Sequence, residues 1–400
     1  MVTTAEPQME AIRQELPVLE RMVYLNSGTA GPLPRRTVAA ITAASERQLL
    51  DGRASFPVYF EEYFPLLADV RARFARLLGA DTGEVAITHH TTEGMNIATW
   101  GLNWQPGDEI VLTTHEHEAG LLPAYAVARR FGLGVRLVDT GGAPDTVAGA
   151  VIAALSPRTR LVILSHVTFT TGAILPVQEI AAAAHRLGAL VAVDGAQSVG
   201  AIPVDVHALD VDFYAVPGQK WLCGPEGVGA LYVRQACLSA LAPTFIGAFG
   251  LRDFEAMDLT GHFLPAPDAR RYEQSSVYWP TLYGMRESLR WMEEDLGWPW
   301  VFAQTAAITA RCRALLSELP GVTLHTPMPQ GPLTAFSVAG HEAQATATYL
   351  GDQGIVIRPI PHYDWLRVAT GFFTNDADLE RLRDGLLTLP ALGAEGPGAP

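Results

Sequence analysis

The feature that most constrains the fold is a regular alternation of short apolar runs with segments whose apolar residues recur at helical spacing. The runs predict seven strands, at 84–88, 109–114, 135–139, 160–167, 189–194, 212–218 and 227–233. Several of these strands are separated by helical patterns, at 119–131, 144–155 and 177–187. Runs that are apolar throughout indicate strands buried on both faces. We therefore expect an α/β fold with a mostly parallel seven-stranded sheet between helices.

The pattern changes after about residue 260, and the chain is expected to divide there. Residues 281–318 are strongly helical apart from a break at 297–299, and shorter strands and helices follow. A chain of 400 residues is long enough for two or three structural units. We predict an N-terminal helical segment, a large α/β domain, a smaller C-terminal α+β domain and a flexible tail, at 1–20, 21–260, 261–390 and 391–400.

The composition argues against several classes of function. With 28 Lys and Arg against 42 Asp and Glu, the net charge is −14, whereas a protein that binds nucleic acid needs a basic face. Three scattered cysteines are too few for a disulfide framework or a zinc site. No apolar run reaches the ~18 residues of a membrane span, and the N-terminus lacks a secretory signal pattern. We expect a cytoplasmic protein that binds no metal, nucleic acid or membrane.

Lys220 is the only lysine in the chain, because all other residues of the Lys and Arg total are arginines. A nucleotide bias towards arginine codons explains the missing lysines but not the one that remains. Arginine cannot replace lysine where an amine must lose its proton and form a Schiff base. The position of Lys220 in a Gly- and Pro-rich turn after a predicted strand therefore indicates chemistry at this amine.

Four polar motifs follow the ends of predicted strands, which is where ligands bind in open α/β sheets. Taken singly, each motif has an ordinary structural reading as a helix cap or a solvated loop. Small hydroxyls and bare N–H groups at a helix start also suit a phosphate, and a buried Asp at a strand end suits a cationic ring. The motifs are HHTTEG at 89–94, THEHEAG at 114–120, VDGAQS at 193–198 and GQKWLCGPEGVG at 218–229.

In this order the motifs resemble the class V aminotransferases, a family of fold type I pyridoxal-phosphate (PLP) enzymes. Within this family the chain looks most similar to the cyanobacterial-type cystine C–S lyases. The resemblance runs over nearly the whole chain and is strongest in GLNWQPGDEIVLTTHEH, RLVILSHVTFTTGAILPVQEI, VDGAQSVGAIPVD and KWLCGPEGVGALYV. It implies PLP as the cofactor, a small amino acid as the substrate, and a homodimer with shared active sites.

Matched by position, the resemblance assigns four residues to the cofactor ring. Lys220 would hold PLP as a Schiff base and later move the α-proton of the substrate. Asp194 would pair with the pyridinium nitrogen, and Gln197 would hydrogen-bond the ring oxygen. His117 would stack on the ring face. Together these residues would make the ring an acceptor for the electrons of a carbanion.

The resemblance also implies residues for the phosphate and for the substrate. The phosphate would be held by Thr91, Thr92, the backbone near Glu93 and Gly94, Gln219, and Ser276 of the second subunit. The substrate α-carboxylate would bind Arg367 in a bidentate manner, beside Arg358 and the backbone at Ala30–Gly31. The alternative for Arg367 is a salt bridge with Asp364 or Asp376 inside the small domain.

Departures from the family pattern narrow the expected reaction. Pro217 and Gln219 replace a hydroxyl residue and a histidine before the lysine, and Phe169 replaces an asparagine of many desulfurases. The segment PIPHYDWL lacks the cysteine that receives sulfur in desulfurases, and Cys223 is more typical of a small buried hydrophobe. We expect a PLP-dependent β-elimination C–S lyase acting on cysteine- or cystine-type substrates. The alternatives are an aminotransferase, an epimerase, or a non-catalytic scaffold of the same fold.

Overall fold

The structure is a computed structural model that describes residues 8–53, 56–139 and 144–389. Its centre is a seven-stranded sheet in the order β2-β8-β7-β6-β5-β3-β4. All strands run parallel except β8, which is antiparallel to both of its neighbours. The strands are β2 Val85–Thr88, β3 Glu109–Thr113, β4 Gly134–Val138, β5 Thr159–Ser165, β6 Leu190–Asp194, β7 Phe213–Pro217 and β8 Gly229–Val233. The predicted α/β sheet is confirmed, strand by strand.

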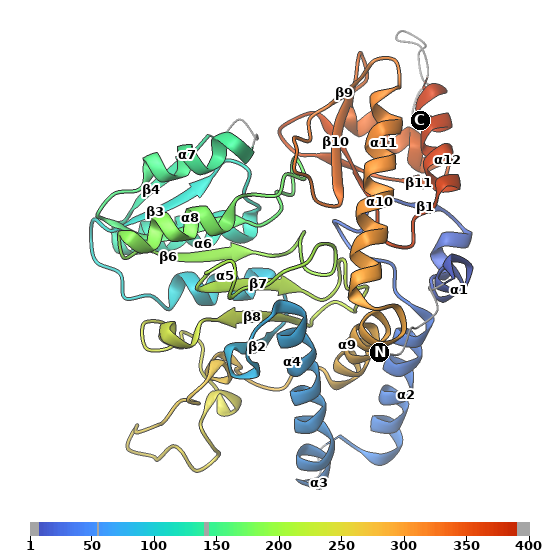
Figure 1. The fold of residues 1–400 in the computed structure, drawn as a ribbon. Coiled ribbons are helices and arrows are strands. Elements are labelled where there is room, and N and C mark those ends of the chain that lie inside the picture. Colours follow the sequence, from blue (N-terminus) through green and yellow to red (C-terminus); the bar gives the residue numbers. More distant parts are fainter. Residues whose placement is uncertain (1–7, 54–55, 140–143, 390–400) are drawn as a thin grey trace, which may run out of the picture.

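Helices cover both faces of this sheet (Figure 1). On one face, α5 Thr91–Trp100 and α6 Glu118–Phe131 enclose a core with the sheet. The other face is covered by α4 Phe64–Leu78, α7 Pro144–Ala154 and α8 Val177–Arg186. Successive residues of β5 point to opposite cores, with Val162 in one and Ile163 in the other. Most strands are therefore buried on both faces, which explains their apolar sequences, whereas the edge strand β4 is largely exposed.

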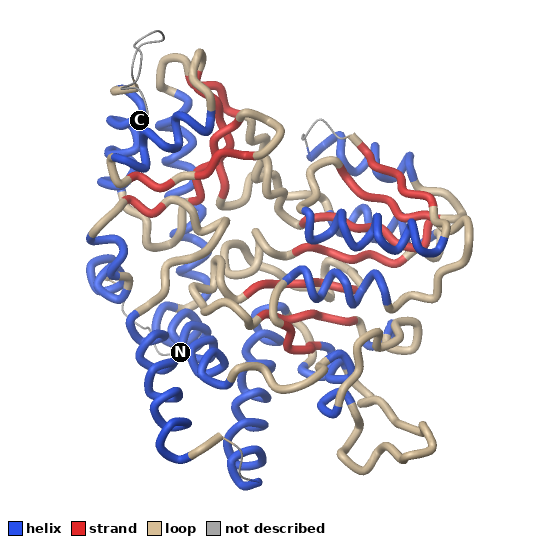
Figure 2. The backbone as a smooth tube through the Cα atoms, turned by 180° about the vertical axis from the view of Figure 1, so that it is seen from behind, coloured by secondary structure: helices blue, strands red, loops and turns tan. Residues whose placement is uncertain are grey.

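A second, four-stranded antiparallel sheet belongs to the C-terminal part of the chain, in the order β12-β13-β10-β9 (Figure 2). Its core includes side chains from the helices that pack beside it. The chain start also contributes, because β1 pairs in parallel with β11. The elements are β1 Val23–Tyr24, β9 Val322–Leu324, β10 Leu333–Val338, β11 Ile355–Val356, β12 Arg358–Ile360, β13 Trp365–Ala369, α10 Trp298–Ser317, α11 Ala343–Asp352 and α12 Asp376–Leu387.

The large core extends beyond the domain boundary expected at residue 260. Helix α9, Trp279–Arg290, packs on α2, Arg35–Asp51, and on α4. Its residues Leu282 and Met285 are fully buried in the same core as the central sheet. We propose that the division between the two units lies near Gly297, where α10 begins.

The chain termini are only partly covered by the described residues. The expected helical segment at 1–20 contains α1 Met9–Glu15 and a 3-10 turn Pro17–Glu20, and the expected tail at 391–400 lies outside the described residues. Sequence patterns predicted no helix at α3 Phe56–Val58 and the π-helix Tyr59–Tyr63 that follows it. Within the part of the chain that the structure describes, no helix is long and apolar enough to span a membrane.

Residues 245–264 form a segment without regular strands that extends from the body at the lower left of Figure 1. We call it the arm. It exposes large apolar side chains that a monomer would ordinarily bury. These are Phe245, Ile246, Phe254, Met257, Leu259, Phe263 and Leu264.

Candidate active site

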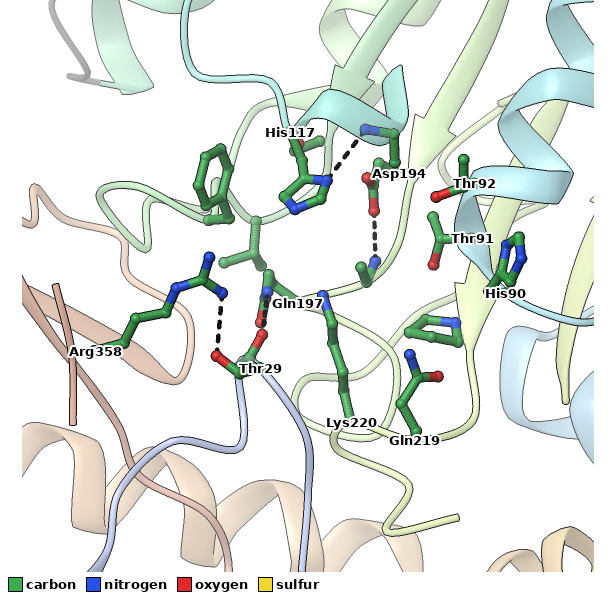
Figure 3. Close-up of a pocket in the computed structure, with 17 residues that line it drawn as sticks. Thr29, His90, Thr91, Thr92, His117, Asp194, Gln197, Gln219, Lys220 and Arg358 are labelled. Carbon is green, nitrogen blue, oxygen red and sulfur yellow. Dashed lines mark hydrogen bonds between the residues drawn. The ribbon is translucent and has the colours of Figure 1, made fainter. Parts of the chain in front are cut away.

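The carboxyl ends of β5, β6 and β7 and the start of α5 meet around one cavity of about 270 Å³ (Figure 3). The cavity lies where the topology of an open α/β sheet predicts a ligand site. Most residues singled out from the sequence lie on its walls. Those residues are Thr91, Thr92, His117, Asp194, Gln197, Gln219, Lys220 and Arg358, beside Gly28, Thr29, Ser165 and Phe169.

Lys220 extends into this cavity from the turn that follows β7. The turn is fixed from the N-terminal side, since the Gly31 N–H donates to the Gln219 carbonyl at 2.7 Å. A Cβ at Gly31 would lie 2.0 Å from the Lys220 carbonyl oxygen, so the two backbones fit together only with glycine here. Burial lowers the pKa of Lys220 to about 8, with Asp194 opposing the shift and the guanidinium of Arg367 adding to it. The uncharged fraction of this amine near neutral pH is therefore minor but much larger than for an ordinary lysine.

Asp194 ends β6 with its side chain 4% exposed. One carboxylate oxygen accepts from the Ala196 N–H at 2.8 Å, and no described residue forms a salt bridge with it. A buried carboxylate that borders a cavity and lacks a cation is a fitting partner for a protonated ring nitrogen. The site thus provides the charge that a pyridinium ring needs.

His117 caps the N-terminus of α6 and faces the same cavity. Its Nδ1 accepts from the Ala119 N–H at 3.1 Å, which places the proton of the neutral ring on Nε2. The ring meets Phe169 edge to face, with centroids 5.0 Å apart. Burial lowers the pKa of His117, so the ring is neutral at pH 7 and can pack against an aromatic cofactor.

The start of α5 has the features of an anion site. The first N–H groups of a helix lack intrahelical partners and carry partial positive charge. Thr91 Oγ1 and Gln219 Oε1 are buried without a hydrogen-bond partner, and both residues line the cavity. The Gln219 amide becomes a donor after a 180° flip. Unsatisfied buried hydroxyl and amide groups at a helix N-terminus fit a phosphate group, so the residues present fit PLP.

Glu93 lies elsewhere than expected, whereas Ser276, which was assigned to the phosphate site of the second subunit, lies outside the cavity of its own chain. The Glu93 carboxylate accepts from the His89 N–H at 2.6 Å and from Gln274, and the Glu93 N–H donates to His90. These contacts occupy both the carboxylate and the backbone N–H of Glu93. Glu93 therefore closes the first turn of α5 and is absent from the cavity wall. Ser276 is exposed in a separate aromatic groove, beside Tyr59, Phe60, Phe64, Phe249 and Phe254.

Gln197 is held in one orientation by two contacts. Its Nε2 donates to the Gly28 carbonyl at 2.8 Å, and the Trp221 indole donates to its Oε1 at 3.0 Å. The second Nε2 hydrogen remains for a ring oxygen. Gln197 therefore also joins the N-terminal loop to the cofactor side of the cavity.

Arg367 is completely buried on β13 without an acidic partner among the described residues. Its Nη1 donates to the Phe169 carbonyl at 2.8 Å and its Nη2 to Thr29 Oγ1 at 3.4 Å, while Nε has no partner. Burial lowers the pKa of Arg367 to about 9. The alternative salt bridges do not form, since Asp364 accepts from a backbone N–H and Asp376 pairs with another arginine.

Arg358 faces Arg367 across the β12–β13 pair and also borders the cavity. Its Nη1 donates to Thr29 Oγ1 at 3.1 Å (Figure 3). The same hydroxyl accepts from Arg367 Nη2, so both guanidinium groups donate to it. Ala30 and Gly31 are not among the residues that line the cavity, and the Ala30 carbonyl accepts from the Tyr24 hydroxyl at 2.8 Å. Thr29 was missed in the sequence, although it immediately precedes Ala30–Gly31 and carries a hydroxyl.

Glu116 is a second residue that sequence reasoning missed. Its buried carboxylate accepts from Thr113 Oγ1 at 2.6 Å and from Ser165 Oγ at 2.7 Å. Burial raises the pKa of Glu116 to about 7, against the two hydroxyl contacts. The residue fixes Ser165, which lines the cavity, and the turn that carries His117. Its place next to His117 in the sequence was the available signal.

Comparison with known proteins agrees with this geometry. The family model described as aminotransferase class V matches residues 23–362. A cysteine desulfurase of Haloferax volcanii is 30% identical over 88% of both chains, and an isopenicillin N epimerase of Streptomyces clavuligerus is 31% identical over 91% of this chain and 94% of its own.

Solved structures extend the comparison to three dimensions. The cystine C–S lyase C-DES, in complex with its product cysteine persulfide, has a TM-score of 0.87 and 31% identity over 93% of this chain and 99% of its own. A mutant of C-DES, with glycine covalently linked to the PLP cofactor, has a TM-score of 0.88 and 30% identity over 94% of this chain and 99% of its own. The non-catalytic scaffold considered above is therefore set aside, and PLP is the cofactor. The chain is an enzyme that belongs to the class V aminotransferase family.

Proposed function

We propose that this enzyme is a β-elimination C–S lyase that cleaves cystine-type amino acids without a persulfide-forming cysteine of its own. With L-cystine the reaction breaks one Cβ–S bond, consumes one water and yields cysteine persulfide, pyruvate and ammonia. No oxidant or reductant is needed. Bound PLP supplies an electron-withdrawing ring that makes the Cα proton removable.

The residues around the cavity provide the proton transfer and the charge balance. The Lys220 amine accepts the Cα proton, and its lowered pKa keeps part of it in the basic form near neutrality. Asp194 keeps the ring nitrogen protonated, because a buried carboxylate favours a cation beside it. Neutral His117 packs against the ring, and Gln197 offers its free N–H to the ring oxygen.

The observation that carries the proposal is the pair of arginines that share Thr29. Arg367 is buried without a carboxylate among the described residues, and Arg358 stands beside it at the cavity wall. A buried cation without a counter-ion is costly, which indicates that a substrate carboxylate completes it. A cystine-type substrate carries two carboxylates and therefore suits two adjacent guanidinium groups.

A sulfur-accepting role for a cysteine of this chain finds no support in the site. Residues 361–364, which join the two arginine strands, contain no cysteine. Cys223 is buried in an apolar cluster, and burial raises its pKa to about 12, so it is a thiol rather than a nucleophilic thiolate. We therefore expect sulfur to leave with the product.

We further propose that the enzyme acts as a homodimer in which the arm covers part of a second copy. The arm exposes Phe254, Met257 and Leu259, of which Leu259 is fully exposed. Ser276 lies next to the arm in the aromatic groove and outside its own cavity. A second copy would bury this apolar surface and would bring Ser276 to the phosphate side of its partner's cavity.

Product analysis with purified enzyme tests the proposed reaction. L-Cystine should yield pyruvate and cysteine persulfide in equal amounts, and Cys223→Ala should retain this activity. Racemisation without pyruvate would instead favour an epimerase, such as the relative from Streptomyces clavuligerus. Transfer of the amino group to a 2-oxo acid would favour an aminotransferase, and alanine formation from cysteine would favour a desulfurase.

A further inference from the structure

Four aromatic rings form a continuous stack from the large unit to the small one. His115, in the turn after β3, stacks on Tyr363 with centroids 5.9 Å apart and 20° between the planes. Tyr363 stacks on Trp365 at 4.6 Å, and Trp365 on His325 at 4.2 Å. The His115–Tyr363 pair is the step that crosses between the units, so it joins two bodies with separate cores.

Tyr363 belongs to the β12–β13 hairpin, whose base carries Arg358 and Arg367. Its turn is conformationally demanding, because His362 and Asp364 have φ values of 69° and 49°, in the left-handed region. Such conformations persist where the surroundings hold them. One anchor is visible, since the Asp364 carboxylate accepts from the Ala343 N–H at 2.8 Å, at the start of α11.

The large unit holds the other end of this connection. His115 is buried, and its Nδ1 is hydrogen-bonded to Thr170 Oγ1 at 2.8 Å. The backbone carbonyl of Phe169, the residue before Thr170, accepts from Arg367 Nη1 at 2.8 Å. One loop of the large unit therefore contacts both the arginine at the base of the hairpin and the ring that meets its tip. A shift of the tip would move Arg367 relative to the loop that orients it.

We propose that the His115–Tyr363 stack is an interdomain clasp that positions the arginine hairpin, and that Tyr363 is a positioning residue for binding the substrate α-carboxylate. The proposal rests on the carboxylate-binding role given above to Arg367, but not on which reaction follows. The clasp acts through ring contact, so the phenol hydroxyl is dispensable. It also acts from both sides, so loss of either ring should have the same effect.

Ligand binding to the PLP-loaded enzyme tests the clasp without turnover. L-Alanine carries the α-carboxylate but no leaving group, and its Kd is measured from the change in cofactor absorbance. Tyr363→Ala and His115→Leu should each raise this Kd about tenfold, in the range of one aromatic contact, and the double variant should add little. Tyr363→Phe should bind as the wild type does. L-Alanine amide, which lacks the carboxylate, should bind equally to all variants.

Tyr349→Ala is the matched control, because Tyr349 is a half-buried tyrosine of the small unit whose hydroxyl donates to the Thr388 carbonyl. It should lower thermal stability and leave the Kd of L-alanine unchanged. The clasp is refuted if Tyr363→Ala binds L-alanine with the wild-type Kd, or if Tyr363→Ala raises the Kd of L-alanine amide as much as that of L-alanine. It is also refuted if Tyr349→Ala raises the Kd of L-alanine to the same extent. If Tyr363→Ala does not fold, Tyr363→Leu and His115→Leu decide. If the variants change the Kd of L-alanine as expected but the wild-type enzyme does not cleave cystine, only the proposed reaction is refuted.

Discussion

At the scale of single residues, the site concentrates positive charge in a buried place. Lys220, Arg358 and Arg367 share one region with the carboxylate of Asp194, and burial lowers the pKa values of Lys220 and Arg367. Such an arrangement costs stability when no ligand is present, because the fully buried Arg367 has lost water without gaining a counter-ion among the described residues. This loss of stability indicates that the site binds an anionic ligand. Two measurements test this interpretation.

The first expectation concerns Arg367→Ala. We expect kcat/KM to fall on the order of a hundredfold or more, because a buried bidentate carboxylate contact is lost. Cofactor content, measured by visible absorbance, should be retained. Arg367→Lys should restore activity only in part, since a point charge lacks the planar fork. Because Arg367 has no acidic partner among the described residues, a large loss of thermal stability with unchanged kcat/KM would contradict the assignment.

The second expectation concerns the pH dependence of the cofactor-free protein. The pKa of Lys220 is about 8 in the folded state and 10.5 in its ordinary state, so the unfolded chain binds more protons between these values. The free energy of unfolding should therefore rise with pH from about 8 to 10.5, relative to Lys220→Met, which cannot titrate. Urea unfolding of both proteins across this range measures the difference. Parallel pH profiles would show that Lys220 is not desolvated in the folded protein.

Sequence reasoning located the residues that chemistry restricts to one residue type. Lys220 was identified because no other residue supplies a reactive amine, and Asp194 because a buried strand ends with it. Thr29 was missed because its importance depends on contacts between distant segments. Thr29 gains its meaning from Arg358 and Arg367, which come more than three hundred positions later. Such pairings leave no local pattern.

At the scale of elements, the strands of the central sheet were predictable because burial on both faces requires continuous apolar runs. The arm and the π-helix Tyr59–Tyr63 were not, because neither has a regular apolar period. Helix α9 was recognised as a helix, but its partners were not. Its amphipathic pattern indicates that one face of the helix is buried. The pattern does not indicate which core that face joins.

A buried ion pair ties helix α4 and the segment around Glu273 to the sheet. Arg71 of α4 makes a bidentate contact with Glu273 at 2.8 Å, and the same carboxylate accepts from the Ile87 N–H of β2 at 2.9 Å. Arg71→Met should lower the free energy of unfolding by ~3–5 kcal/mol, because Glu273 then stays buried without its cation. Adding Glu273→Gln should recover part of the loss.

The exposed pair of Arg311 and Asp376 provides the control for this measurement. Arg311→Met should change the free energy of unfolding by less than about 1 kcal/mol, since surface ion pairs contribute little. Urea unfolding followed by circular dichroism compares the three variants. Equal effects of Arg71→Met and Arg311→Met would show that the buried pair is not what fixes α4 to the sheet.

At the scale of the whole molecule, one chain leaves two features without an explanation. The arm exposes apolar side chains, and Ser276, which the family resemblance assigns to the phosphate site of the second subunit, lies in the aromatic groove outside its own cavity. A homodimer accounts for both, because the arm would be covered and Ser276 would serve the partner's phosphate site. Leu259→Asp should then weaken self-association, as measured by light scattering over a range of protein concentrations.

A mixing experiment tests whether the active site is shared. Lys220→Ala removes the reactive amine, and Ser276→Glu places a negative charge where a phosphate would bind, so each homodimer should be inactive. Random exchange of equal amounts gives about one half mixed dimers. In a mixed dimer, one cavity combines an intact Lys220 with the partner's intact Ser276, so about a quarter of wild-type activity should appear. If Ser276 served its own chain, no cavity would contain both intact residues, and mixing would restore nothing. Recovery that depends on exchange between subunits therefore separates a shared site from two independent ones.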